Sequence, residues 1–161
     1  MTKGSDPARQ LLRHTLATIA YRGGKALRGA PASFAEFRAS ESTRTPLQIL
    51  AHIGDLLDWG LSVAQGKQEW RESKPGSWDG EVTRFHRSLQ KLDDYLASAE
   101  PLRETPEKLF QGPIADSLNH VGQLTMLRRV AGSPIKGENY HKADITAGRV
   151  GADQPAPRCE F

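Results

Sequence analysis

The chain has 161 residues, a length that suits one domain with its own hydrophobic core. Its only cysteine, Cys159, excludes an intramolecular disulfide and a site built from several thiolates, and it favours a reducing, cytoplasmic location. The net charge of +3 comes from basic residues that alternate with acidic ones, so we rank nucleic-acid binding last. No apolar stretch approaches the roughly 18 residues of a membrane-spanning helix, and the N-terminus lacks the apolar core of a signal peptide.

The first helix is predicted at about 7–27. Asp6 fits the N-cap and Pro7 the first helical position, and apolar residues then repeat at helical spacing. The linker that follows is mixed in composition. It contains Phe34 and Phe37, and we therefore expect it to pack on the body of the protein.

The second helix has the strongest start signal and is predicted at about 46–65. Thr45 fits the N-cap, Pro46 the first position and Gln48 the third, which together form a capping box. A broad apolar face follows and ends near Gly66.

Two further helices are predicted at about 80–98 and 113–131. In the helix at 80–98, apolar residues recur at spacings of three and four and form a seam typical of helix bundles. These residues are Val82, Phe85, Leu89, Leu92 and Leu96. The helix at 113–131 ends where Gly132 and Pro134 act as stop signals. The last segment, 133–161, is rich in Gly, Pro and charge and predicts an ordered or semi-ordered extended tail.

Four helices with no strand pattern between them predict an all-α fold, a four-helix bundle formed by a single domain over residues 1–161. The first connection is long for a simple hairpin of antiparallel helices. It therefore permits a crossover between parallel or non-adjacent helices.

Asp116 and His120 lie four residues apart in the last helix, so their side chains share one helix face. Carboxylate oxygen and imidazole nitrogen both bind zinc, nickel, manganese or iron. His52, at the border of the apolar face of the second helix, is the candidate third ligand. Three protein ligands leave coordination positions open for water or substrate, which is typical of a catalytic metal.

The residues alone leave other interpretations open. A lone histidine at an apolar border is more often a hydrogen-bonded core residue, and Asp116 could serve the dipole at the start of its helix. Asp55 could orient a ligand histidine from behind it. Gln123 and Tyr140 could line the open side of a metal pocket.

Two stretches, TPLQILAHIGDLLDW and DSLNHVGQLTMLRRVAGSPI, and the intervening helix of matching length resemble the DinB-like (DinB/YfiT) superfamily of metal-dependent four-helix-bundle proteins. The resemblance covers about residues 6–135. His52 and His120 match metal-ligand positions of the family, with the sequence HVGQL around the latter. Asp116 stands where many members carry His, although a carboxylate at this position occurs among thiol-dependent members.

The resemblance implies a bundle of up-down-down-up topology, often a homodimer, with zinc or nickel as the common metal and iron or manganese as alternatives. The implied function is that of a metal-dependent enzyme, a thiol-dependent transferase or a hydrolase, acting on a small-molecule substrate with or without a low-molecular-weight thiol. No separate general base is evident in the sequence. The alternative is a non-catalytic metal-binding or stress-associated helical bundle.

Overall fold

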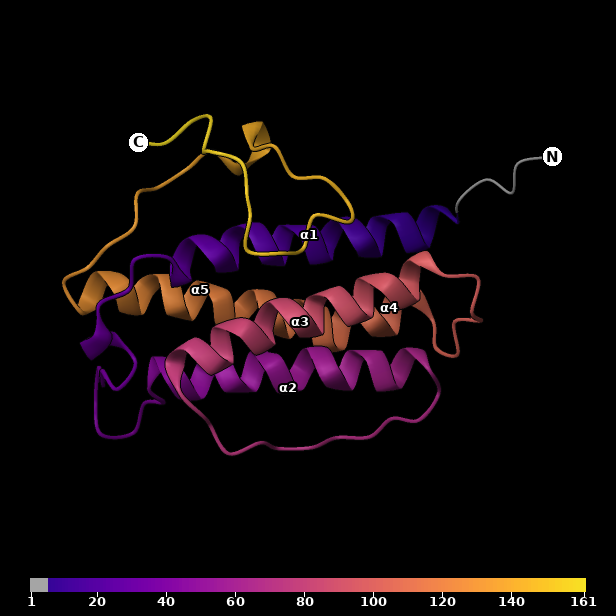
Figure 1. Ribbon diagram of the computed structural model, residues 1–161, viewed down its shortest axis with the longest axis horizontal. Helices are drawn as coiled ribbons and strands as arrows, with labels where there is room; N and C mark the ends of the chain where they lie inside the picture. The colour runs from indigo at the N-terminus through magenta and orange to yellow at the C-terminus, as the bar shows by residue number, and fades with distance from the viewer. Residues whose placement is uncertain (1–5) are drawn as a thin grey trace.

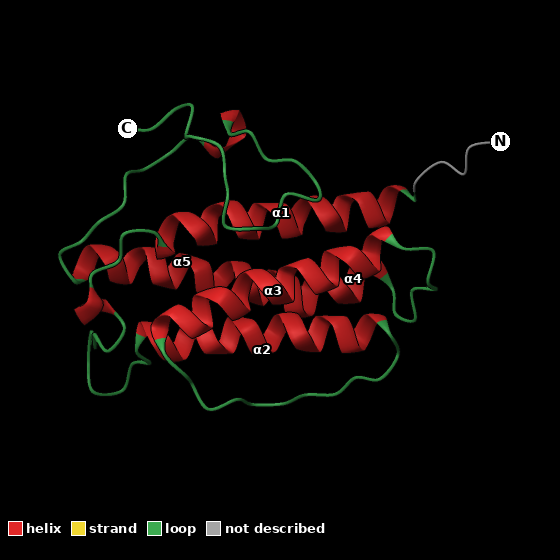
Figure 2. Cartoon of the chain, in the orientation of Figure 1, coloured by secondary structure: helices red, strands yellow, loops and turns green. Residues whose placement is uncertain are grey.

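A computed structural model describes residues 6–161, and over this range the chain is all-helical, which confirms the predicted all-α class. The helices, in chain order, are α1 (Pro7–Leu27), α2 (Pro46–Ala64), α3 (Trp78–Ala97), the single turn α4 (Pro106–Leu109) and α5 (Ala115–Val130) (Figure 1). Loops and short 3-10 turns join them, and the described residues contain no strand (Figure 2). None of these helices is both long and apolar enough to cross a membrane.

Local capping determines where the long helices begin. In α2 the predicted capping box is present: Gln48 N–H donates to Thr45 Oγ1 at 3.2 Å, and Thr45 N–H donates to Gln48 Oε1 at 2.9 Å. Helix α3 begins at Trp78, slightly before its predicted start, because Ser77 caps it by accepting from Gly80 N–H at 3.1 Å.

The last helical stretch differs from the prediction of 113–131. It begins at Pro106, with Thr105 as N-cap, and a π-helical turn at Phe110–Ile114 joins α4 to α5. Pro113 lies inside this turn. Proline has no N–H for the usual helical hydrogen bond, and the wider turn accommodates it without ending the helix.

The helices α3 and α5 each pack against both α1 and α2. In Figure 1 the connection 65–77 runs back along α2, so that α2 and α3 start at the same end, whereas α5 runs in the direction of α1. The predicted seam on α3 is buried except for Val82, which is half-buried. The centre of the core contains Leu16, Ile19, Leu50, Ile53, Leu57, Phe85, Leu89 and Leu92.

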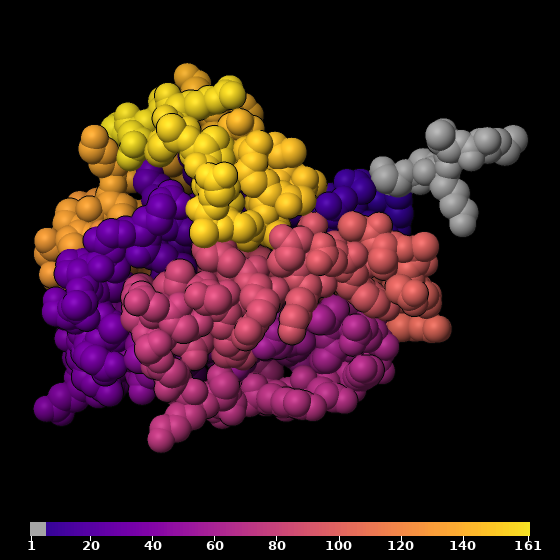
Figure 3. Space-filling model, in the orientation of Figure 1, coloured from indigo at the N-terminus to yellow at the C-terminus, as the bar shows by residue number. Residues whose placement is uncertain are grey.

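The tail, residues 133–161, is ordered and folds back over α1; in Figure 3 its atoms cover much of that helix on the face shown. It is held by a buried carboxylate, because the Glu138 side chain has no exposed surface and accepts from Lys25 Nζ at 2.8 Å. The Tyr21 hydroxyl also donates to Glu138. Burial, followed by this hydrogen bond, raises the pKa of Tyr21.

An arginine on α3 holds the connection 65–77 against α2. Arg84 pairs with Asp55 and reaches Asp58 Oδ2 at 3.0 Å, while Asp55 also accepts from Ser73 N–H at 3.1 Å and from Ser73 Oγ at 2.7 Å. Gly54 makes room for this arrangement, since a Cβ there would lie 2.9 Å from Arg84 Nη1. The connection is therefore fixed in place beside the middle of α2.

Candidate metal centre

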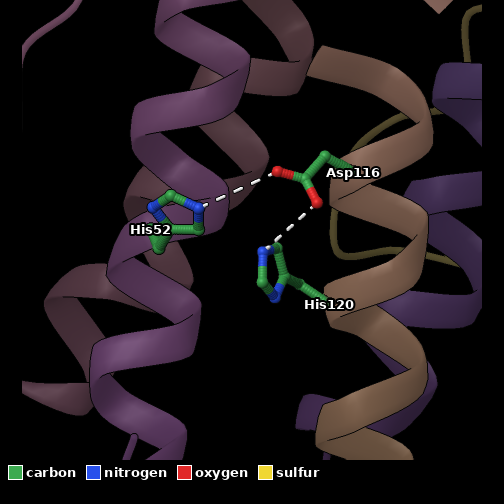
Figure 4. A group of neighbouring side chains, drawn as sticks. All are labelled: His52, Asp116 and His120. Carbon is green, nitrogen blue, oxygen red and sulfur yellow. Dashed lines mark ion pairs between the residues drawn. The ribbon is translucent and has the colours of Figure 1, made fainter. Parts of the chain in front are cut away.

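The structure brings the three predicted ligands together between α2 and α5 (Figure 4). His52 projects from α2, and Asp116 and His120 project from successive turns of α5. One donor atom from each residue lies within 4.8 Å of the other two. Asp116 Oδ1 is 3.5 Å from His120 Nε2, and Asp116 Oδ2 is 4.0 Å from His52 Nε2.

The π-helical turn and a glycine position the backbones of α2 and α5 so that the three side chains lie close together. The turn at Phe110–Ile114 comes directly before α5 and sets the face that α5 presents from Ala115 onward. Gly60 on α2 lets the two segments approach, because a Cβ there would lie 3.2 Å from Pro113 Cβ. The spacing of four residues then places Asp116 and His120 on one face of α5.

His120 is oriented by a neighbour on its own helix. Its Nδ1 lies 2.7 Å from Gln123 Oε1, and an amide oxygen can only accept, so Nδ1 carries the proton. The Nε2 lone pair is then left free on the side that faces Asp116. His120 is also 9% exposed, which limits the motion of the ring. This pairing is typical of a metal-ligating histidine, whose second nitrogen usually has a hydrogen-bond partner.

His52 is half-buried, and its ring packs edge to face with that of His120 at a centroid separation of 4.8 Å. The pKa of His52 is lowered from its ordinary value, first by burial and then by the charges of His120 and Arg44. The neutral imidazole is therefore favoured. A neutral ring keeps the lone pair that a metal ion requires.

Asp116 is the most accessible of the three, with 46% of its side chain exposed. Metal bonds to imidazole nitrogen and carboxylate oxygen are about 2.0–2.2 Å long, so the donors around one ion lie roughly 3–3.5 Å apart. The two carboxylate–imidazole separations exceed this by about an ångström or less, and the widest separation in the set, within 4.8 Å, exceeds it by more, so rotation of an imidazole ring as well as of the half-exposed carboxylate is needed to close the site. Two imidazoles and one carboxylate thus provide a donor set that fits a divalent cation.

The sequence also suggested three residues as neighbours of the metal ligands, and the structure places only one of them in contact with a ligand. Gln123 lies at the site, in contact with His120. Tyr140 lies elsewhere, in the tail, where its ring packs edge to face on Tyr21. The interpretation of Asp55 as a partner of a ligand histidine is wrong, because its carboxylate faces Arg84 and the connection 65–77.

Sequence reasoning missed two residues beside the site. Trp70, from the connection 65–77, packs edge to face on His52 at 5.7 Å and on Trp59 at 5.9 Å. Arg44, just before the N-cap of α2, lines hollows that contain His52 and His120. A tryptophan inside an otherwise polar loop is the one signal that could have indicated the first of these.

No protein-family model, curated protein or solved structure matches this chain. The site is therefore interpreted from its own geometry and donor chemistry.

Replacing Gln123 with leucine is expected to weaken zinc binding about tenfold, because His120 then loses the partner that fixes its tautomer and ring orientation. Gln123 is exposed, so the fold should tolerate the change. Isothermal titration calorimetry with zinc measures the effect, and Gln10→Leu on α1 is the matched control. Equal zinc affinities in the Gln123→Leu variant and the wild type would contradict the role given to Gln123.

Proposed function

We propose that this chain is a metal-dependent enzyme of the DinB-like type, in which His52, Asp116 and His120 hold one divalent ion. The observation that supports the proposal most is the convergence of these three donors from α2 and α5, with His120 Nδ1 already engaged by Gln123. Zinc or nickel suits two imidazoles and a carboxylate, and iron or manganese is the alternative.

The fold part of the proposal is that α1, α2, α3 and α5 form the up-down-down-up bundle of that superfamily. The course of the connection 65–77, which starts α2 and α3 at the same end, supports this topology. In such a bundle the metal ligands project from facing helices into the interior. The pairing of His52 on α2 with two donors on α5 follows this plan.

Three protein ligands would leave a coordination position of the ion open, which suits catalysis. A divalent ion held here would act as a Lewis acid and would lower the pKa of bound water or of a thiol, so that a nucleophile could form at neutral pH. The chain itself orients the ligands, through Gln123 on His120 and the Trp70 ring against His52. A hollow of about 380 Å³ beside His120 gives a small molecule room to approach, which favours an enzyme over a purely structural site. The reaction class that we propose is thiol transfer or hydrolysis.

Cobalt(II) substitution tests whether a coordination position is open. Adding 2-mercaptoethanol to the cobalt-loaded wild type is expected to produce a thiolate-to-cobalt charge-transfer absorption and to alter the visible bands. The matched control His14→Ala, which removes an exposed histidine on α1, should respond as the wild type does, whereas His120→Ala should not. A cobalt spectrum that ignores both thiol and azide would contradict the catalytic proposal. Together with a large fall in melting temperature on chelation, it would favour a non-catalytic site that ties α2 to α5.

A further inference from the structure

Two hollows lie beside the candidate metal centre, and each contains one of its histidines. The larger, of about 380 Å³, lies between the start of α2 and the second half of α5 and contains His120. The smaller, of about 170 Å³, lies between α2 and the connection 65–77 and contains His52. A molecule in either hollow would therefore lie next to a metal ligand.

The larger hollow has an apolar wall beyond His120. Ile49 on α2 and Met126 and Leu127 on α5 form this wall, which extends from His120 toward the end of α5. Met126 is 61% exposed, an unusual position for a large apolar side chain. A ligand with an apolar arm would bury this surface.

One cation lines both hollows. Arg44 is exposed, and among residues 6–161 no ion pair and no side-chain hydrogen bond engages its guanidinium. Its backbone is fixed nevertheless, because Thr45 next to it caps α2. The neighbouring Thr43 hydroxyl is already occupied, since it donates to Ser40 O at 2.9 Å. Arg44 is therefore the charged group that is left to recognise a ligand here.

The charge around the centre indicates which anion fits. A guanidinium binds one carboxylate through two parallel hydrogen bonds. A doubly charged phosphate ester would need the metal ion itself as its second cation, and it would meet the carboxylates of Asp116 at the centre and Glu72 in the smaller hollow. A monoanion is the better match to a single arginine.

We propose that the larger hollow binds a small carboxylic acid with an apolar chain, its carboxylate on Arg44 and its chain against Met126 and Leu127. Because Arg44 lines the hollows on both sides of the centre, the carboxylate end lies nearest the metal position. The bond that reacts is therefore close to the carboxylate of the substrate. This inference rests on the proposed function, since it specifies the substrate of the same site.

The test compares hexanoate with hexanamide, its neutral analogue of similar shape. Both probes are titrated into zinc-loaded and metal-free protein, for the wild type, Arg44→Gln and the control Arg87→Gln, which removes an exposed arginine on α3. We expect the wild type and the control to prefer hexanoate to hexanamide. In Arg44→Gln hexanoate should bind about tenfold more weakly, and the preference should disappear.

The proposal is overturned if hexanoate binds Arg44→Gln as tightly as the wild type, or if wild-type protein shows no binding at millimolar concentrations. The zinc content of each variant is measured alongside. A wild type that takes up no zinc contradicts the metal-dependent function. A wild type that holds zinc but does not prefer hexanoate, or a preference that survives in zinc-loaded Arg44→Gln, contradicts only the substrate class.

Discussion

Replacing Arg84 with leucine is expected to lower the free energy of unfolding by about 3 kcal/mol, because it leaves a buried carboxylate without its cation. The Asp55 side chain is 3% exposed and that of Arg84 is 17% exposed, so water screens their pairing weakly. The variant should also loosen the connection 65–77, which Asp55 holds through Ser73. Urea unfolding measures the stability, and hydrogen exchange at the Ser73 amide measures the local effect.

Arg87→Leu is the matched control, since it removes an exposed arginine from the same helix, and its stability should stay within about 0.5 kcal/mol of the wild type. A loss in Arg84→Leu that is no larger than in this control would show that the Arg84 pairs contribute little. Unchanged exchange at Ser73 would contradict the proposed anchoring of the connection.

Glu138→Leu is expected to destabilise the protein by a similar amount, roughly 3 kcal/mol, by leaving the Lys25 ammonium buried without its main partner. The Tyr21 hydroxyl loses its acceptor at the same time. The double variant Lys25→Met with Glu138→Leu removes both charges and should regain part of the loss. Thermal and urea unfolding of the three proteins provide the comparison.

Glu160→Leu is the internal control for this experiment. Glu160 contacts the same Lys25 Nζ at 3.2 Å, but its side chain is 31% exposed, so its loss should cost less than about 1 kcal/mol. If Glu138→Leu is no more destabilising than Glu160→Leu, the tail is not held by the buried carboxylate, and the role of this anchor is wrong.

Helix starts were predictable where the signal is local. The Thr45 cap and the Gln48 side chain lie within one turn of each other, and their hydrogen bonds need no distant partner. The start of the last helix was harder to predict because a proline marks two positions in the sequence, Pro106 after Thr105 and then Pro113, and the prediction placed the start at the second. Only the π-helical turn, which depends on packing of Pro113 near Gly60 of α2, shows that the helix passes through this proline.

The same distinction between local signals and long-range contacts applies to the candidate site. The pairing of Asp116 with His120, and that of His120 with Gln123, follows from spacing within one helix. The positions of Trp70 and Arg44 depend on where the connections lie against the helices, and this is set by contacts between residues far apart in the sequence. The pairing of Asp55 with Arg84 on another helix is of this kind, and it explains why the interpretation of Asp55 was wrong.

The most direct test of the account is the zinc stoichiometry of purified protein, measured by elemental analysis after removal of loosely bound metal. We expect one zinc per chain in the wild type and in the control His14→Ala, and stoichiometric zinc to be lost in His52→Ala and in His120→Ala, because each variant removes one of three converging donors. A wild type without stoichiometric metal, or histidine variants with the zinc content of the wild type, would contradict the metal centre.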